Sequence, residues 1–126
     1  MRSRFSREWK RSRKPSKQRA YQRNAPLHIR HRMMAAHLSK ELNRKYKRRS
    51  IAVRKGDQVK VMRGQFKGKV GRINRADLKK QRVYIDGVEV NKKDGSKAFY
   101  PLHPSKLLII DLNTEDKKRM AAVNRG

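Results

Sequence analysis

The chain has 126 residues, of which 35% are hydrophobic and 37% are charged, so a large hydrophobic core is excluded. With 37 Lys and Arg against 10 Asp and Glu, the net charge of +27 predicts an acidic partner, and nucleic acid is the first candidate. There is no cysteine, which excludes disulfides, thiolate metal sites and cysteine nucleophiles and favours a reducing cytosol. We expect no signal peptide and no membrane span. A mitochondrial transit peptide is disfavoured because the positive charge continues past Arg30.

Residues 1–24 form a basic segment without a periodic apolar face. Phe5, Trp9 and Tyr21 are set singly among Arg and Lys, so the segment cannot offset the entropy of ordering by itself. The sequence therefore predicts an extended tail that is disordered without RNA. Trp9 and Tyr21 could stack on exposed bases or pack against a neighbouring protein, and the residues leave both readings open.

Residues 25–50 are predicted to form one or two short basic helices. Pro26 suits a first helical turn, and a set of apolar side chains recurs at spacings that a helix would place on one side. The apolar set is Leu27, Ile29, Met33, Met34, Leu38, Leu42 and Tyr46.

Residues 51–112 change to a period of two, with short Val- and Ile-rich runs divided by Gly, Asp and Asn turns. About five strands in so short a segment predict a small closed barrel, because closure removes exposed sheet edges. Residues 113–126 are expected to begin with a polar cap and an acidic first turn, at Glu115-Asp116, and to end with Lys, Arg and a final Gly. This order predicts a short C-terminal helix.

The segment Val53 to Ile73 combines strand patterns with closely spaced glycines. A turn at Gly56-Asp57 is expected to precede a strand with Val59 and Val61 inward and with Gln58 and Lys60 outward. The following strand should return with Val70 and Ile73 inward.

The glycines of this segment have separate predicted roles. Gly64 and Gly68 would allow positive φ and a close approach to a strand or a phosphate, and Gly71 would permit a bulge. Basic side chains at the turn and at outward positions could neutralise phosphates. Phe66 could stack on a base or cap the barrel, and the sequence does not decide between these.

Three segments resemble one family. "GDQVKVMRGQFKGKVGRI" (Gly56 to Ile73) resembles the KOW motif of RNA-associated β barrels, which transcription elongation factors also carry. "YIDGVEVNKKDG" and "PLHPSKLLIIDL" resemble downstream segments of the universal KOW-bearing large-subunit ribosomal protein family, number twenty-four. "NAPLHIRHRMMAAHLSKELNRKY" is similar to the N-terminal extension of its archaeal and eukaryotic branch, whose eukaryotic counterpart is number twenty-six. The short C-terminus favours an archaeal form.

The resemblance implies a mainly β fold: a small SH3-like (KOW) barrel with a basic N-terminal extension containing short helices, and a short C-terminal helix. It implies a structural constituent of the large ribosomal subunit in the cytoplasm that binds the 5′ domain of large-subunit rRNA. It also implies a part in nucleating subunit assembly, a position near the polypeptide exit tunnel beside neighbouring ribosomal proteins, and neither a cofactor nor a homo-oligomer. The candidate RNA-binding residues are Arg2, Arg4, Arg7, Trp9, Lys10, Arg11, Arg13, Lys14, Lys17, Arg19, Arg23, Arg30, Arg32, Arg48, Arg49, Arg63, Gly64, Phe66, Lys67, Gly68, Lys69, Arg72, Arg75, His103 and Lys106.

Other functions are less well supported by the residues. A transcription elongation or antitermination module would need an α/β domain that residues 1–50 are too basic to form. A chromatin protein that compacts DNA would instead prefer duplex DNA. His28, His31 and His37 lack a nearby carboxylate or thiolate that would complete a metal site. No nucleophile, base and orienting group can be assigned, so we expect no enzyme.

Overall fold

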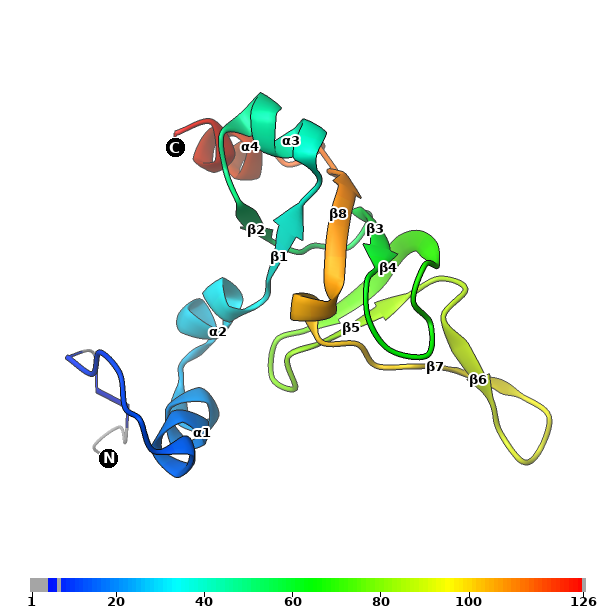
Figure 1. Ribbon diagram of the computed structural model, residues 1–126, viewed down its shortest axis with the longest axis horizontal. Coiled ribbons are helices and arrows are strands. Elements are labelled where there is room, and N and C mark those ends of the chain that lie inside the picture. The colour runs from blue at the N-terminus through cyan, green and yellow to red at the C-terminus, as the bar shows by residue number, and fades with distance from the viewer. Residues whose placement is uncertain (1–4, 7, 126) are drawn as a thin grey trace.

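The computed structural model describes residues 5–6 and 8–125, and it arranges short helices around a curved sheet (Figure 1). Arg2, Arg4 and Arg7, which are candidate RNA-binding residues, lie outside the described residues. In chain order the elements are α1 (Pro15–Asn24), α2 (Leu27–Met33), β1 (Ala35–Leu38), α3 (Lys40–Tyr46), β2 (Ser50–Ala52), β3 (Gln58–Val61), β4 (Val70–Asp77), β5 (Arg82–Ile85), β6 (Glu89–Asn91), β7 (Lys97–Phe99), the 3₁₀ turn η1 (Pro104–Lys106), β8 (Leu107–Asp111) and α4 (Lys117–Asn124).

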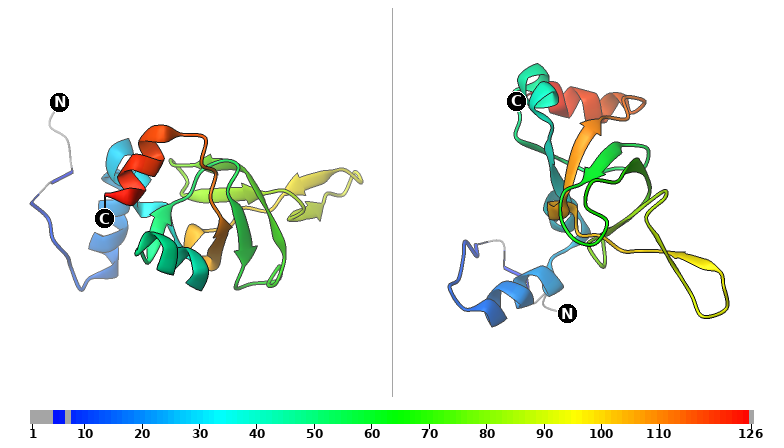
Figure 2. Two further views of the ribbon diagram at one scale, coloured as in Figure 1. Left: turned by 90° about the horizontal axis from the view of Figure 1, so that it is seen from above. Right: turned by 45° about the vertical axis from the view of Figure 1, so that its right-hand side comes forward.

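The main sheet has six strands in the order β2-β1-β8-β3-β4-β5. β1 and β8 are parallel and the other neighbours are antiparallel. The outermost strands, β2 and β5, do not pair with each other, so the expected closed barrel is not formed. After β5 the chain instead leaves the sheet as the separate β6–β7 hairpin, which stands off the body (Figure 2). The free edge of β5 is partly covered by Leu102, which exchanges backbone hydrogen bonds with Val83 at 2.7 and 3.0 Å.

The core follows the predicted alternation in β3. Val59 and Val61 are fully buried, whereas Lys60 is exposed. The prediction for β4 was wrong at Val70, which is 50% exposed. The inward positions of β4 are Gly71 and Ile73, two residues apart as a regular strand requires.

Gly71 is needed because another backbone lies close to it. A Cβ at this position would lie 2.5 Å from the Asp86 carbonyl oxygen and 2.9 Å from Ile85 Cγ2. The bulge that we expected at Gly71 is not there: the bulge of β4 lies further along the strand, between Ile73 and Arg75. Gly71 therefore allows a close approach, and the bulge leaves an extra residue, Asn74, on the β4 side.

Strand β1 was not predicted from the sequence, which indicated only helices over residues 25–50. The structure places α2 and α3 in this segment and β1 between them. Ala36 and Leu38 are buried and His37 is exposed, because β1 lies between β2 and β8 and completes the ladder there. Alanine has little preference for strands, so the tertiary pairing determines this element.

Helix α1 occupies part of the tail that we expected to be extended. It begins at Pro15, whose fixed φ suits a first helical position, and none of its residues is buried. Figure 1 shows it at the periphery, at the lower left of the view, away from the sheet. The helix contributes nothing to the core, and disorder of the tail without RNA stays a prediction.

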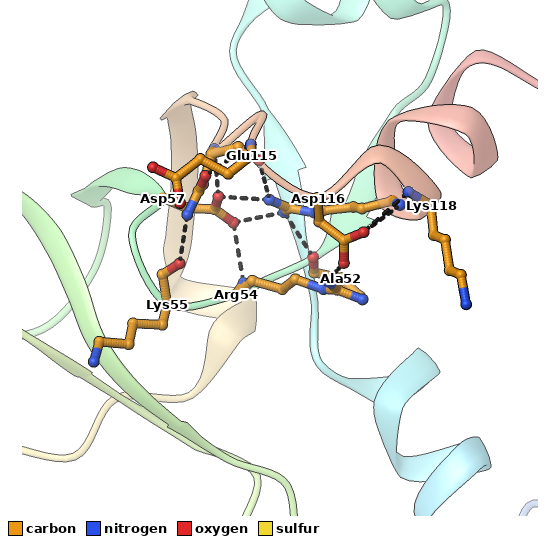
Figure 3. Close-up of polar contacts among 9 residues, drawn as sticks. Ala52, Arg54, Lys55, Asp57, Glu115, Asp116 and Lys118 are labelled. Carbon is orange, nitrogen blue, oxygen red and sulfur yellow. Dashed lines mark hydrogen bonds and ion pairs between the residues drawn. The ribbon is translucent and has the colours of Figure 1, made fainter.

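The C-terminal helix α4 is fixed to the body by a buried ion pair that the sequence did not reveal (Figure 3). Arg119 donates to both carboxylate oxygens of Asp57, at 2.7 and 2.6 Å, and to the backbone carbonyl of Ala52 at 3.1 Å. Asp57 also accepts from the backbone N–H groups of Arg54 and Asn113. Asp116 caps the helix by accepting from the N–H groups of residues 118 and 119. The helix is therefore present, but its acidic residue is the N-cap: the first turn holds no acidic residue and the last turn no basic one, which corrects the expected charge order.

Candidate nucleic-acid interface

A basic hollow of about 620 Å³ lies between α1 and the turn that joins β4 to β5. None of the described residues that line it is acidic, so six Lys and Arg side chains converge there without a carboxylate in the lining. Such a site attracts phosphate groups. The lining residues are Arg19, Gln22, Arg23, Arg30, Lys79, Lys80, Gln81, Arg82 and His103.

Arg30 connects the two sides of the basic hollow. Its guanidinium donates to the carbonyl oxygen of Lys79 at 2.6 Å, to that of Ala25 at 2.8 Å, and to that of Arg23. These bonds use three different nitrogens, Nε, Nη1 and Nη2, whereas a lysine has all its donors on a single nitrogen. Arg30 therefore positions the segment before α2 against the β4–β5 turn, in addition to any contact with RNA.

The β4–β5 turn presents its basic side chains through a strained backbone conformation. Gln81 has φ +54°, in the left-handed region, and the Asp77 carboxylate accepts from the N–H of Lys80 at 3.2 Å. Lys79 and Lys80 are exposed at the tip. These two lysines and Arg82 were not among the RNA-binding residues predicted from the sequence. The run "DLKKQR" between two strand patterns was the available signal, because it places consecutive basic residues on a hairpin turn.

His103 lies at the edge of the basic hollow and caps the 3₁₀ turn. Its Nδ1 accepts from the backbone N–H of Ser105 at 3.2 Å and lies 2.8 Å from the Ser105 hydroxyl oxygen. Partial burial lowers the pKa of His103 below the ordinary 6.5, and the positive charges of Arg82 and Lys106 lower it further. The lowered pKa favours the neutral imidazole in the free protein.

The loop between β3 and β4 has the predicted turn glycines on an open surface. Gly64 and Gly68 have φ of +94° and +92°, and a Cβ at either position would meet no atom within 4 Å. These glycines therefore serve the positive φ and not a close approach within the chain. Arg63 and Lys67 are exposed on the same loop, where they are accessible to a polyanion.

Phe66, for which the sequence left two roles open, packs within the molecule. Its ring is half-buried against the core, and its centroid lies 5.0 Å from that of Tyr100. The Lys69 Nζ lies 5.4 Å from the Phe66 centroid. The structure thus favours the capping role for Phe66, while Lys69 remains exposed beside it.

The remaining predicted RNA-binding residues fall into exposed and engaged groups. Arg48 donates to the carbonyls of Ala122 and Val123 at 2.8 and 3.0 Å, so it binds the C-terminal end of α4. Trp9 stacks on Tyr21, with ring centroids 4.2 Å apart, so in this structure the two rings contact each other. The exposed residues are Lys10, Arg11, Arg13, Lys14, Lys17, Arg32, Arg49, Arg72, Arg75 and Lys106. Two of these also have a partner within the chain, since Arg72 donates to the Gly56 carbonyl at 3.3 Å and Arg75 lies over the Tyr84 ring.

The fold and this surface define a class of protein: a small β-rich scaffold that presents positive charge to a polyanion. Among the described residues, no helix has the length and apolar character that crossing a membrane requires. The chain also matches, over residues 12–126, the family that comprises the eukaryotic ribosomal proteins L26 and their archaeal counterparts, the ribosomal proteins L24. The protein belongs to this family. It is therefore a ribosomal protein of the cytoplasm and not an enzyme.

A curated relative supports the archaeal branch of the family. The chain is 46% identical over 114 residues to the large ribosomal subunit protein uL24 of Methanosphaera stadtmanae. The alignment covers 90% of this chain and 97% of the relative. The resemblance noted in the sequence is thus confirmed along almost the whole chain.

Proposed function

We propose that the protein is a structural constituent of the large ribosomal subunit that binds the 5′ domain of large-subunit rRNA. It would help to nucleate subunit assembly and would lie near the polypeptide exit tunnel, beside neighbouring large-subunit proteins. The name of the archaeal relative supports the subunit, and the sequence resemblance supports the rRNA domain and the position. The curved six-stranded sheet would act as an open form of the SH3-like KOW barrel.

The observation that carries rRNA binding is the basic hollow between α1 and the β4–β5 turn. Its six Lys and Arg side chains converge from segments far apart in the sequence, so neighbouring strands of a folded RNA could be neutralised together. A solvated surface is a poor alternative explanation, because ten acidic residues cannot balance 37 basic ones within the chain. The exposed β3–β4 loop would add backbone contacts at its glycines.

The first test is cosedimentation of the endogenous protein with the two ribosomal subunits through a high-salt sucrose gradient. Stoichiometric retention in the large subunit is expected. Release into the light fractions, or migration with RNA polymerase or DNA, would contradict the proposal. Migration with RNA polymerase would favour the transcription elongation alternative, and migration with DNA would favour the chromatin alternative.

A second test addresses the basic hollow itself. The double substitution Lys79→Gln/Lys80→Gln should weaken binding to a 5′-domain rRNA transcript and reduce the salt slope. The matched control is Lys117→Gln/Lys118→Gln, which removes the same charge from α4, at the other end of the sheet (Figure 1). Equal losses in the two variants would show that only net charge matters and would contradict a defined site.

A further inference from the structure

A second hollow, of about 410 Å³, lies between β4–β5 and the protruding β6–β7 hairpin. It is separate from the basic hollow, with which it shares no lining residue. The lining of this second hollow also differs from that of the basic hollow, because it contains aromatic rings and a side-chain amide as well as basic residues. The residues that matter here are Asn74, Arg75, Tyr84, Lys92, Lys97 and Phe99.

Two aromatic rings form one wall of this hollow. Tyr84 and Phe99 meet edge to face, with centroids 6.4 Å apart and planes 67° apart. The Arg75 guanidinium lies 4.5 Å from the Tyr84 centroid and so occupies one face of that ring. Phe99 is 39% exposed, so its ring offers more accessible apolar surface than the partly buried ring of Tyr84.

Polar groups surround the rings with unused hydrogen-bonding capacity. Asn74 is the residue at the β4 bulge, its side chain is exposed, and its amide bonds no other group within the described chain. Lys92 and Lys97 are exposed and form no ion pair with a described residue. Glu89 is opposite Phe99 in the hairpin, but no acidic residue is among the described residues of the lining.

We propose that this hollow binds an unpaired nucleotide of the rRNA, with its base stacked on Phe99. The proposal rests on the proposed rRNA-binding function. The Asn74 amide, with both a donor and an acceptor, would bond the edge of the base, and Lys92 and Lys97 would contact the flanking phosphates. Bases inside a duplex are stacked on both sides and would not present a free face to Phe99, so an unpaired base is the occupant that the exposed ring favours.

The test compares a single-stranded oligoribonucleotide of about ten nucleotides, carrying one 4-thiouridine, with a blunt RNA duplex. Phe99→Leu keeps the apolar contact but removes the aromatic face, and Phe99→Trp restores a face. Tyr100→Leu is the matched control, since Tyr100 is adjacent, 36% exposed and packed on Phe66 outside the hollow. Thermal unfolding of each variant checks that the fold is intact.

Phe99→Leu is expected to weaken single-strand binding about fivefold or more, the effect of losing one base–aromatic stack, and to leave duplex binding unchanged. Phe99→Trp and Tyr100→Leu should bind like the parent, and light-induced crosslinks should map to Tyr84 or Phe99. If Phe99→Leu and Tyr100→Leu behave alike and crosslinks fall elsewhere, the nucleotide site is refuted although rRNA binding stands. If the parent protein binds neither probe nor rRNA, both proposals fail.

Discussion

Asp57 and Arg119, 62 positions apart in the chain, form a bidentate ion pair in the interior of the protein. Asp57 is fully buried and Arg119 is 6% exposed. Together with the contacts of both residues to nearby backbone groups, the pair joins the turn before β3 to helix α4. A protein with a large positive charge thus uses one of its few acidic residues to neutralise a buried arginine and fix its C-terminus.

Removing one partner of this pair should be strongly destabilising. Arg119→Met would leave the Asp57 carboxylate buried with only backbone donors, and a loss of about 3–5 kcal/mol in the free energy of unfolding is expected. Urea unfolding monitored by circular dichroism measures it. Arg54→Met is the control, because it removes an exposed ion pair with Asp116 and should cost much less. Similar losses in the two variants would contradict a special role for the buried pair.

Two glycines of the KOW-like segment should respond differently to substitution. Gly71→Ala places a methyl group against the Asp86 carbonyl, and a loss of about 1–3 kcal/mol is expected from overpacking. Gly68 has open space but a positive φ, so Gly68→Val should be worse than Gly68→Asn, because Asn tolerates the left-handed region. Thermal unfolding ranks the variants. No difference between Val and Asn at position 68 would exclude backbone strain as the cause.

Deletion of residues 1–23 should leave the sheet folded and flatten the salt dependence of RNA binding. None of the residues in α1 is buried, so the core loses no contact with this helix, whereas many phosphate-binding charges are removed. Binding to a 5′-domain rRNA transcript is measured over a range of salt concentrations. An unchanged slope would show that the tail does not contact phosphate.

His103 should make RNA binding depend on pH. Its pKa lies below 6.5 in the free protein, because of burial and then the charges of Arg82 and Lys106. Phosphate in the basic hollow would offset these charges and raise the pKa, so the complex would bind more protons and affinity should rise as pH falls between about 7.5 and 5.5. Because the pKa of His103 is lower in the folded than in the unfolded protein, the unfolded state binds more protons. The free protein should therefore lose stability as the pH falls over the same range.

The measurement is an NMR titration of the His103 ring with and without RNA, together with affinities at each pH. His103→Asn is the control, because asparagine can still cap the 3₁₀ turn but does not titrate. A pH dependence of the same size in this variant would assign the effect to other groups.

The sequence predicted those features that depend on local pattern. The alternation of Val59 and Val61, the turn at Gly56-Asp57 and the polar cap of the C-terminal helix can be read from neighbouring residues. They are confirmed because each rests on strand period, glycine φ or helix capping. The strong positive charge likewise predicted a polyanionic partner without any coordinates.

Other features depend on contacts between segments that are distant in the sequence, and predictions made from the local pattern were wrong for these features. β1 exists because β2 and β8 lie on either side of it, and Val70 faces outward because Gly71 approaches Asp86. The open sheet edge also follows from the path of the β6–β7 hairpin.

By itself, the sequence determined the family, the basic character and the local turns, because these reside in residue types and short spacings. Only the tertiary structure decided which basic residues converge and which are engaged inside the protein. It brought Arg30 to the β4–β5 turn, Arg119 to Asp57, and Phe99 beside Tyr84. The physical reason is that burial and convergence of charge are properties of distance in space, and distance along the chain does not fix them.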